Sequence, residues 1–240
     1  MDIQPHDQLD RLPTELKCIV ARLLTALDNR KSLVLVNKAW AAVGLPFRWE
    51  TFTTDLVHSN PRSLLGLGHP NSSIVKHVRN INLLARASSS NVDYLLTLLA
   101  KILRGQLHGF KSKETIQAST LSLLLVLHPA LEVLHVPGGA MLGDTLQSPW
   151  TSDCFSNLTS MDIYTQCFSG KDLSRIATSC PKLEQLSLDL YSLVPGNVDA
   201  PNYDIIGRAP NSTQAPSEFE VALNAIASMP NLHTLRITNP

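Results

Sequence analysis

Apolar residues near the start of the chain recur every three or four positions, which is the spacing of one helical face. After Pro13 the series consists of Leu16, Ile19, Val20, Leu23, Leu24 and Leu27. This spacing predicts an amphipathic helix with one wide apolar stripe. Pro13 suits the first turn of such a helix, and Glu15 complements the positive end of the helix dipole.

A second apolar series follows Asp28 and Asn29, which interrupt the first pattern and can cap a helix. It consists of Leu33, Leu35, Val36, Ala39, Trp40 and Val43, and Pro46 is expected to end it. The sequence thus predicts two or three short helices within residues 12–50. So few residues cannot bury both stripes well, so either the following residues or a hydrophobic groove of another protein must cover them.

The stretch 9–40 resembles the F-box family. It has Leu12-Pro13, an acidic residue two places after the proline, an Asp-containing turn and the segment Val36-x-Lys38-x-Trp40, although Phe47-Arg48-Trp49 replaces the family's final Leu-Trp pair. The resemblance implies an F-box helical domain over residues 1–56. It also implies a Skp-family linker as partner and, through that linker, a cullin scaffold. The contact residues it implies are Leu12, Pro13, Leu16, Ile19, Leu23, Leu33, Val36 and Trp40.

Downstream, an apolar frame of the form L-x-x-L-x-L recurs six times. Its first positions are separated by 29, 24, 27, 25 and 49 residues, close to the period of a leucine-rich repeat with one double-length gap. The frames are Val78-Ile81-Leu83, Leu107-Phe110-Ser112, Leu131-Leu134-Val136, Leu158-Met161-Ile163, Leu183-Leu186-Leu188 and Leu232-Leu235-Ile237. Helical patterns lie between them at 92–103, 115–127, 171–178 and 217–228.

This alternation of short strands and helices predicts an α/β fold. We expect residues 57–240 to form a leucine-rich-repeat-like solenoid with a parallel sheet and with helices on its convex side. Residues 191–216 are rich in Pro, Asn, Gly and Ser and are expected to form an irregular loop. The last frame ends at Ile237, so we expect an open sheet edge there. The repeats also resemble those of divergent fungal F-box proteins.

The residues between the apolar positions of each frame point to the opposite face of the sheet. As a set they are polar and mixed in charge, and tyrosine and arginine are frequent anchors of protein interfaces. Each one alone is more often an ordinary solvated residue. The predicted substrate-face residues are Asn82, Lys111, His135, Asp162, Tyr164, Asp189 and Arg236.

Composition and the absence of known motifs argue against several classes of function for this protein. The 20 Lys and Arg balance the 20 Asp and Glu, so nucleic acid and membrane partners are not expected. No secretory leader is recognisable, which predicts a cytoplasmic or nuclear protein. The four cysteines form no C-x-x-C pair and are expected to be reduced, mostly buried thiols. We find no catalytic motif, metal-ligand motif or cofactor fingerprint, and we expect a protein that is not an enzyme.

Together, the resemblance and the repeats imply a substrate-recognition adaptor of an SCF-type E3 ubiquitin ligase, whose repeats bind a target protein. Two alternatives remain open. One is a stand-alone repeat module whose N-terminal helices only cap the solenoid. The other is an F-box protein that binds the linker but acts outside ubiquitination.

Overall fold

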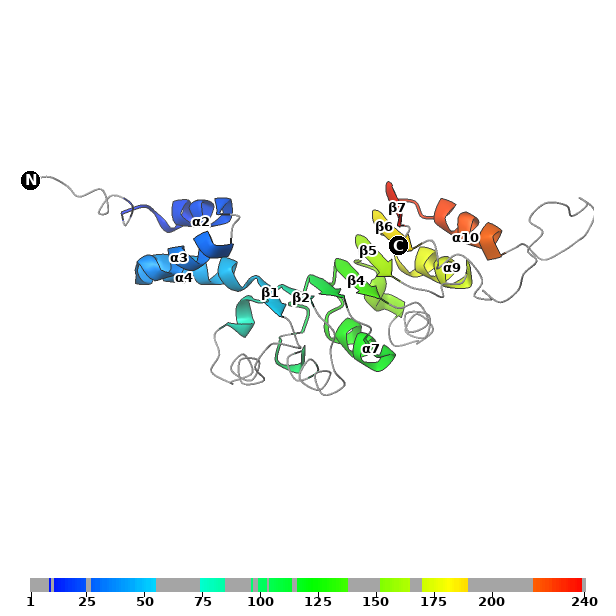
Figure 1. The fold of residues 1–240 in the computed structure, drawn as a ribbon, viewed down its shortest axis with the longest axis horizontal. Coiled ribbons are helices and arrows are strands. Elements are labelled where there is room, and N and C mark those ends of the chain that lie inside the picture. The colour runs from blue at the N-terminus through cyan, green and yellow to red at the C-terminus, as the bar shows by residue number, and fades with distance from the viewer. Residues whose placement is uncertain are drawn as a thin grey trace, which may run out of the picture.

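A computed structural model describes residues 9, 11–24, 27–54, 74–84, 96, 99–102, 104–113, 116–137, 152–164, 170–189 and 218–238. The described part of the N-terminal region contains the helices α2 (Thr14–Leu23), α3 (Leu27–Val36) and α4 (Lys38–Trp49). A sheet with further helices follows them (Figure 1). The α/β fold class is therefore confirmed.

The sheet has seven strands, all parallel, and their order in the sheet is their order in the chain. Each strand therefore pairs only with the strands before and after it in sequence. The strands are β1 (Thr51–Thr54), β2 (Asn80–Leu83), β3 (Gly109–Ser112), β4 (Val133–Pro137), β5 (Ser160–Tyr164), β6 (Gln185–Asp189) and β7 (Thr234–Thr238). All six predicted frames form strands in a parallel sheet.

Helices connect several of these strands on one side of the sheet. They are α7 (Ala118–Leu127), α9 (Gly170–Ser179) and α10 (Glu218–Ala227), with the short 3-10 helices η1 (Val75–His77) and η2 (Ser152–Phe155). Figure 1 shows the sheet as an arc with α7, α9 and α10 outside it and with the inner, concave face open. The helices expected at 115–127, 171–178 and 217–228 are confirmed. Of 92–103 only part is described, and the predicted loop 191–216 lies outside the described residues.

The core lies between the sheet and these helices. One register row runs across all seven strands through Phe52, Ile81, Phe110, Leu134, Met161, Leu186 and Leu235. The first six are buried, whereas Leu235 is 40% exposed because, among the described strands, β7 pairs with β6 alone. Ile237 on the same strand is exposed as well. The edge expected at the last frame is therefore open.

The turns before strands β2 to β7 all contain the same pair of backbone hydrogen bonds to the preceding repeat. The N–H groups of Arg79 and Asn80 both donate to the carbonyl of Glu50, at 2.8 Å each. Equivalent pairs of N–H groups donate to one carbonyl at every later step, at distances between 2.7 and 3.2 Å, and this sets the register of the next strand. The accepting residues are Glu50, Arg79, His108, Glu132, Thr159 and Glu184.

Two sequence expectations about the N-terminal helices are wrong. Pro46 does not end a helix, because α4 continues through it to Trp49, which packs against the sheet core. Asp28 and Asn29 follow Leu27, the first residue of α3, and so do not occupy the N-cap position of that helix. Asn37 occupies the N-cap of α4, where its Oδ1 accepts a hydrogen bond from the Trp40 N–H at 3.0 Å.

Candidate protein-binding surfaces

The three N-terminal helices are organised around α4. Gly44 in α4 allows α3 to approach closely, because a Cβ at this position would lie 3.0 Å from Cγ2 of Val34 and 3.5 Å from Cδ2 of Leu33. On α2, Lys17 and Ala21 are buried, and the Lys17 ammonium lies 5.7 Å from the centre of the buried Trp40 ring. Helix α2 therefore rests on α4 through a lysine, an alanine and a cation–π contact.

The opposite face of α2 is apolar and open to solvent. Leu16, Ile19 and Leu23 recur at helical spacing and are 46%, 52% and 73% exposed, whereas Lys17 and Ala21 are 7% and 1% exposed. Helices of globular proteins usually bury their leucines and expose their lysines. The inverted arrangement leaves three large apolar side chains partly in water, and burial of the exposed part of each would contribute about 1–2 kcal/mol. A grouped apolar surface of this kind indicates a binding site.

The structure separates the predicted linker-contact residues into two groups. Pro13, Leu16, Ile19, Leu23 and Val36 are exposed, and Leu12 is half-buried. Leu33, also half-buried, packs on Gly44, and Trp40 is buried under Lys17, so these two side chains hold the helices together. Leu35 was not among the predicted residues, although it is 80% exposed at the end of α3. Its position in the second apolar series could have identified Leu35 as a candidate contact residue.

Arg30 fixes the ends of two helices, a role that the sequence did not indicate. From α3, its Nε donates to the carbonyl of Leu24 at 2.6 Å, and its Nη1 donates to the carbonyl of Phe47 at 3.2 Å. Leu24 caps the end of α2, and Phe47 lies in the last turn of α4, where carbonyls have no partner within the helix. One guanidinium therefore ties α2 and α4 to α3.

On the concave face of the sheet, polar residues form a second register row. It consists of Thr53, Asn82, Lys111, His135, Asp162, Ser187 and Arg236, one residue from each strand. Five of the seven predicted substrate-face residues lie in it. The other two, Tyr164 and Asp189, lie two residues further along β5 and β6, and their side chains are outside the described part of the structure.

His135 and Asp162 occupy the middle of this row. Nδ1 of His135 lies 3.9 Å from Oδ2 of Asp162, and its Nε2 lies 3.4 Å from Oγ of Ser160. Burial and the charge of Lys111 lower the pKa of His135, and Asp162 opposes them only in part. The imidazole is therefore neutral at pH 7, so the fixed charges of the row are those of Lys111, Asp162 and Arg236.

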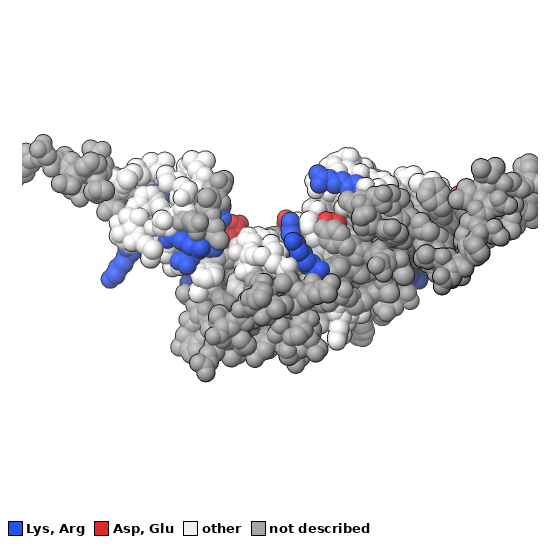
Figure 2. Space-filling view, in the orientation of Figure 1, with Lys and Arg blue, Asp and Glu red and all other residues white. Residues whose placement is uncertain are grey.

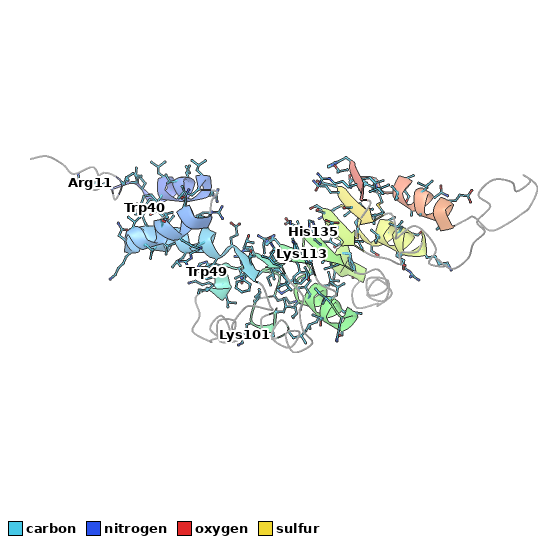
Figure 3. All side chains as sticks on the ribbon, viewed as in Figure 1. Arg11, Trp40, Trp49, Lys101, Lys113 and His135 are labelled. Atoms are coloured by element: carbon cyan, nitrogen blue, oxygen red, sulfur yellow. The ribbon has the colours of Figure 1, made fainter. Side chains whose placement is uncertain are left out.

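The C-terminal half of the row lines a small hollow over β4 to β7. Its cavity volume is about 80 Å³, and its lining includes His135, Asp162, Gln185 and Arg236. That volume exceeds the share of two water molecules in the liquid and is far below the several hundred Å³ of a small-molecule site. Figure 2 shows the concave side of the molecule in profile, with basic and acidic side chains close together, and Figure 3 places His135 and Lys113 near the middle of the sheet. The hollow has room for a single side chain of a ligand.

The described thiols and potential metal ligands were the remaining candidates for reactive chemistry. Burial raises the pKa of Cys154 and raises that of Cys180 to about 12, so both thiols are protonated and poor nucleophiles. Within the described ranges, no group of three or more His, Cys, Asp or Glu side chains is placed to hold a metal ion. The described helices are likewise all too short or too polar to span a membrane.

Comparison with known proteins does not assign the chain to a family. No family model matches the sequence, and no curated protein matches it.

Proposed function

We propose that this chain is an F-box protein that serves as the substrate-recognition adaptor of an SCF-type E3 ubiquitin ligase. In this proposal the N-terminal helices bind a Skp-family linker, and the repeats form a leucine-rich-repeat-like solenoid that binds the target protein. The observation that carries the proposal is the inverted burial of α2, in which Leu16, Ile19 and Leu23 are exposed while Lys17 and Ala21 are buried.

This arrangement suits a helix that enters the hydrophobic groove of a partner. Because these three side chains are 46–73% exposed, their burial by a linker would contribute on the order of 4 kcal/mol before the entropic cost of association is subtracted. Leu35 and Val36 provide further exposed apolar surface at the end of α3. The candidate linker surface therefore extends beyond α2 to the end of α3.

The connection between the two parts supports an adaptor role. Helix α4 contacts η1 and β1, and Trp49 packs into the sheet core, so the linker-binding helices are joined directly to the sheet. A target held on the concave face would keep a defined distance from the linker. An adaptor of this kind acts by raising the effective concentration of the target near the ubiquitin-charged partner.

A second candidate function is a stand-alone repeat module whose N-terminal helices only cap the solenoid. The packing of Trp49 against the core favours it, because this is what a capping helix does. However, capping by α4 leaves the apolar face of α2 uncovered, so it does not account for Leu16, Ile19 and Leu23.

Direct binding to a purified Skp-family linker distinguishes the two candidates. We expect the double variant Leu16→Glu/Ile19→Glu to lose at least about a hundredfold in affinity, because two buried contacts are replaced by two desolvated charges. Binding is measured by calorimetry, and folding is checked by circular dichroism. Leu223→Glu is the matched control, since Leu223 on α10 is equally apolar and 49% exposed.

Loss of affinity in the α2 variant but not in Leu223→Glu supports the F-box proposal. Equal affinity of the folded α2 variant and the unmodified chain contradicts it and favours the capping function. Target turnover by Leu16→Glu/Ile19→Glu then tests the ubiquitination step, because an adaptor that no longer binds the linker no longer promotes turnover of its bound target.

A further inference from the structure

The second register row, which lies on the concave face and is called the concave row below, carries a charge on every second strand from β3 to β7. These charges alternate in sign. Lys111 on β3 is positive, Asp162 on β5 is negative and Arg236 on β7 is positive. His135 on β4 and Ser187 on β6 separate them with neutral groups. Lys111 and Arg236 are exposed, and the Asp162 side chain is 18% exposed at the hollow. A complementary ligand therefore presents an acid, a base and a second acid in line.

The spacing of these charges selects a ligand conformation. Neighbouring strands lie about 4.8 Å apart, so the Cα atoms of Lys111 and Asp162, and those of Asp162 and Arg236, are separated by about 9.6 Å across the sheet. A polyproline II segment has three residues per turn and a rise of about 3.1 Å, which places every third side chain on one face at intervals of about 9.3 Å. In an extended β-strand, residues three apart point to opposite sides. The row therefore matches a polyproline II segment that crosses the strands.

A neighbouring row of polar side chains offers hydrogen-bond partners to the backbone of such a segment. A polyproline II segment makes no internal backbone hydrogen bonds, so its carbonyl and N–H groups need outside partners. Ser160, Gln185 and Thr234 align in register one row away, and they line the same hollow as Asp162. A helical ligand satisfies its own backbone groups and makes no use of this row.

From this geometry we propose that the concave face binds a polyproline II segment of the target protein with the pattern acid-x-x-base-x-x-acid. The basic side chain enters the hollow toward Asp162, and the two acids lie over Lys111 and Arg236. This inference rests on the proposed function only in identifying the ligand as part of the target, and its binding chemistry is independent of the linker.

The first experiment uses three synthetic peptides and the full chain at low ionic strength, with affinity measured by fluorescence anisotropy. The matched peptide is Glu-Pro-Pro-Lys-Pro-Pro-Glu. The register control is Glu-Pro-Lys-Pro-Pro-Pro-Glu, which has the same composition but a displaced base. The charge control is Lys-Pro-Pro-Glu-Pro-Pro-Lys. We expect the matched peptide to bind at least about tenfold more tightly than either control and to weaken as salt is added.

The second experiment reverses the charges of the protein. Lys111→Glu/Arg236→Glu is expected to weaken the matched peptide by about tenfold or more, because two favourable exposed pairs become repulsive. Asp162→Asn is expected to reduce the preference for the matched peptide over the register control. Lys101→Glu is the matched surface control, since Lys101 is exposed and lies away from the concave face (Figure 3).

No binding of the matched peptide, equal binding of the matched and register peptides, or unchanged binding by Lys111→Glu/Arg236→Glu would each overturn the inference. Linker binding measured on the same proteins keeps the two proposals separate. The concave variants should bind the linker normally, and Leu16→Glu/Ile19→Glu should bind the matched peptide normally. Failure of the peptide experiment therefore leaves the linker-binding proposal intact.

Discussion

At the scale of single residues, His128 makes stability depend on pH. The side chain is fully buried at the end of α7, and its Nδ1 accepts a hydrogen bond from the Leu107 N–H at 3.4 Å. Within the described part of the chain, Nε2 has no hydrogen-bond partner. Burial lowers the pKa of His128 from 6.5 to about 4. The folded protein therefore holds this imidazole neutral.

The unfolded chain binds this proton at a higher pH than the folded protein does. Stability from neutral His128 is thus fully present above about pH 6.5 and is lost as the pH falls toward 4. We expect the free energy of unfolding to be lower at pH 5 than at pH 8 by about 2 kcal/mol from this residue alone. Urea unfolding at both pH values measures the difference. In His128→Gln the difference should shrink by that amount, and an unchanged difference would contradict this account.

At the scale of helices, the arrangement of the N-terminal module depends on Arg30. Its two hydrogen bonds reach carbonyls at the ends of α2 and α4, and hydrogen bonds to a charged group contribute about 1.5–3 kcal/mol. We expect Arg30→Met to speed amide hydrogen exchange in α2 and to lower stability by about 2 kcal/mol. Arg30→Lys should recover only part of this, because an ammonium lacks the planar fork of a guanidinium.

Lys38→Met is the control for removal of a cation, since Lys38 is an exposed residue at the start of α4. It should leave amide exchange in α2 unchanged. If exchange in α2 is also unchanged in Arg30→Met, Arg30 does not fix the end of this helix.

The strands were the elements most readily predicted from sequence, because a buried strand requires apolar residues at alternate positions. Strand β1 was missed although Trp49, Phe52 and Thr54 have the same spacing as every later frame. Trp and Thr replaced the leucines in this frame, so the apolar pattern was weak. Pro46 was misjudged because proline usually ends a helix, whereas here the last turn of α4 is held by the packing of Trp49.

The candidate surfaces were predictable only in part. The spacing of Leu16, Ile19 and Leu23 identified an apolar face of α2, but spacing alone does not show whether that face meets the protein's own core. Which face of α2 is buried depends on the packing of Lys17 over Trp40 and on the hydrogen bonds from Arg30 to the end of α2. Both are contacts between different helices. The alignment of the concave row likewise depends on how loops of different length bring each strand into register.

At the scale of the whole molecule, the sheet is an array of nearest-neighbour contacts. Each described strand pairs with its neighbours in the chain order, so the effect of a substitution depends on whether the strand has one such neighbour or two. Leu134 and Leu235 test this directly, because they occupy the same register row on β4 and β7. Leu134 is fully buried between two neighbouring strands, whereas Leu235 lies on the edge strand and is 40% exposed.

We therefore expect Leu134→Ala to lower the free energy of unfolding by about 3–4 kcal/mol, because it leaves a cavity in a close-packed core. Leu235→Ala should cost about 1 kcal/mol, since part of its side chain is already in water and no cavity is enclosed. Urea unfolding of the two variants side by side measures the difference. Equal losses would mean that stability is shared over the whole sheet, so that the edge strand contributes as much as the centre. A larger loss at Leu134 would show that β4, the strand that presents His135, contributes more to stability than the edge strand β7.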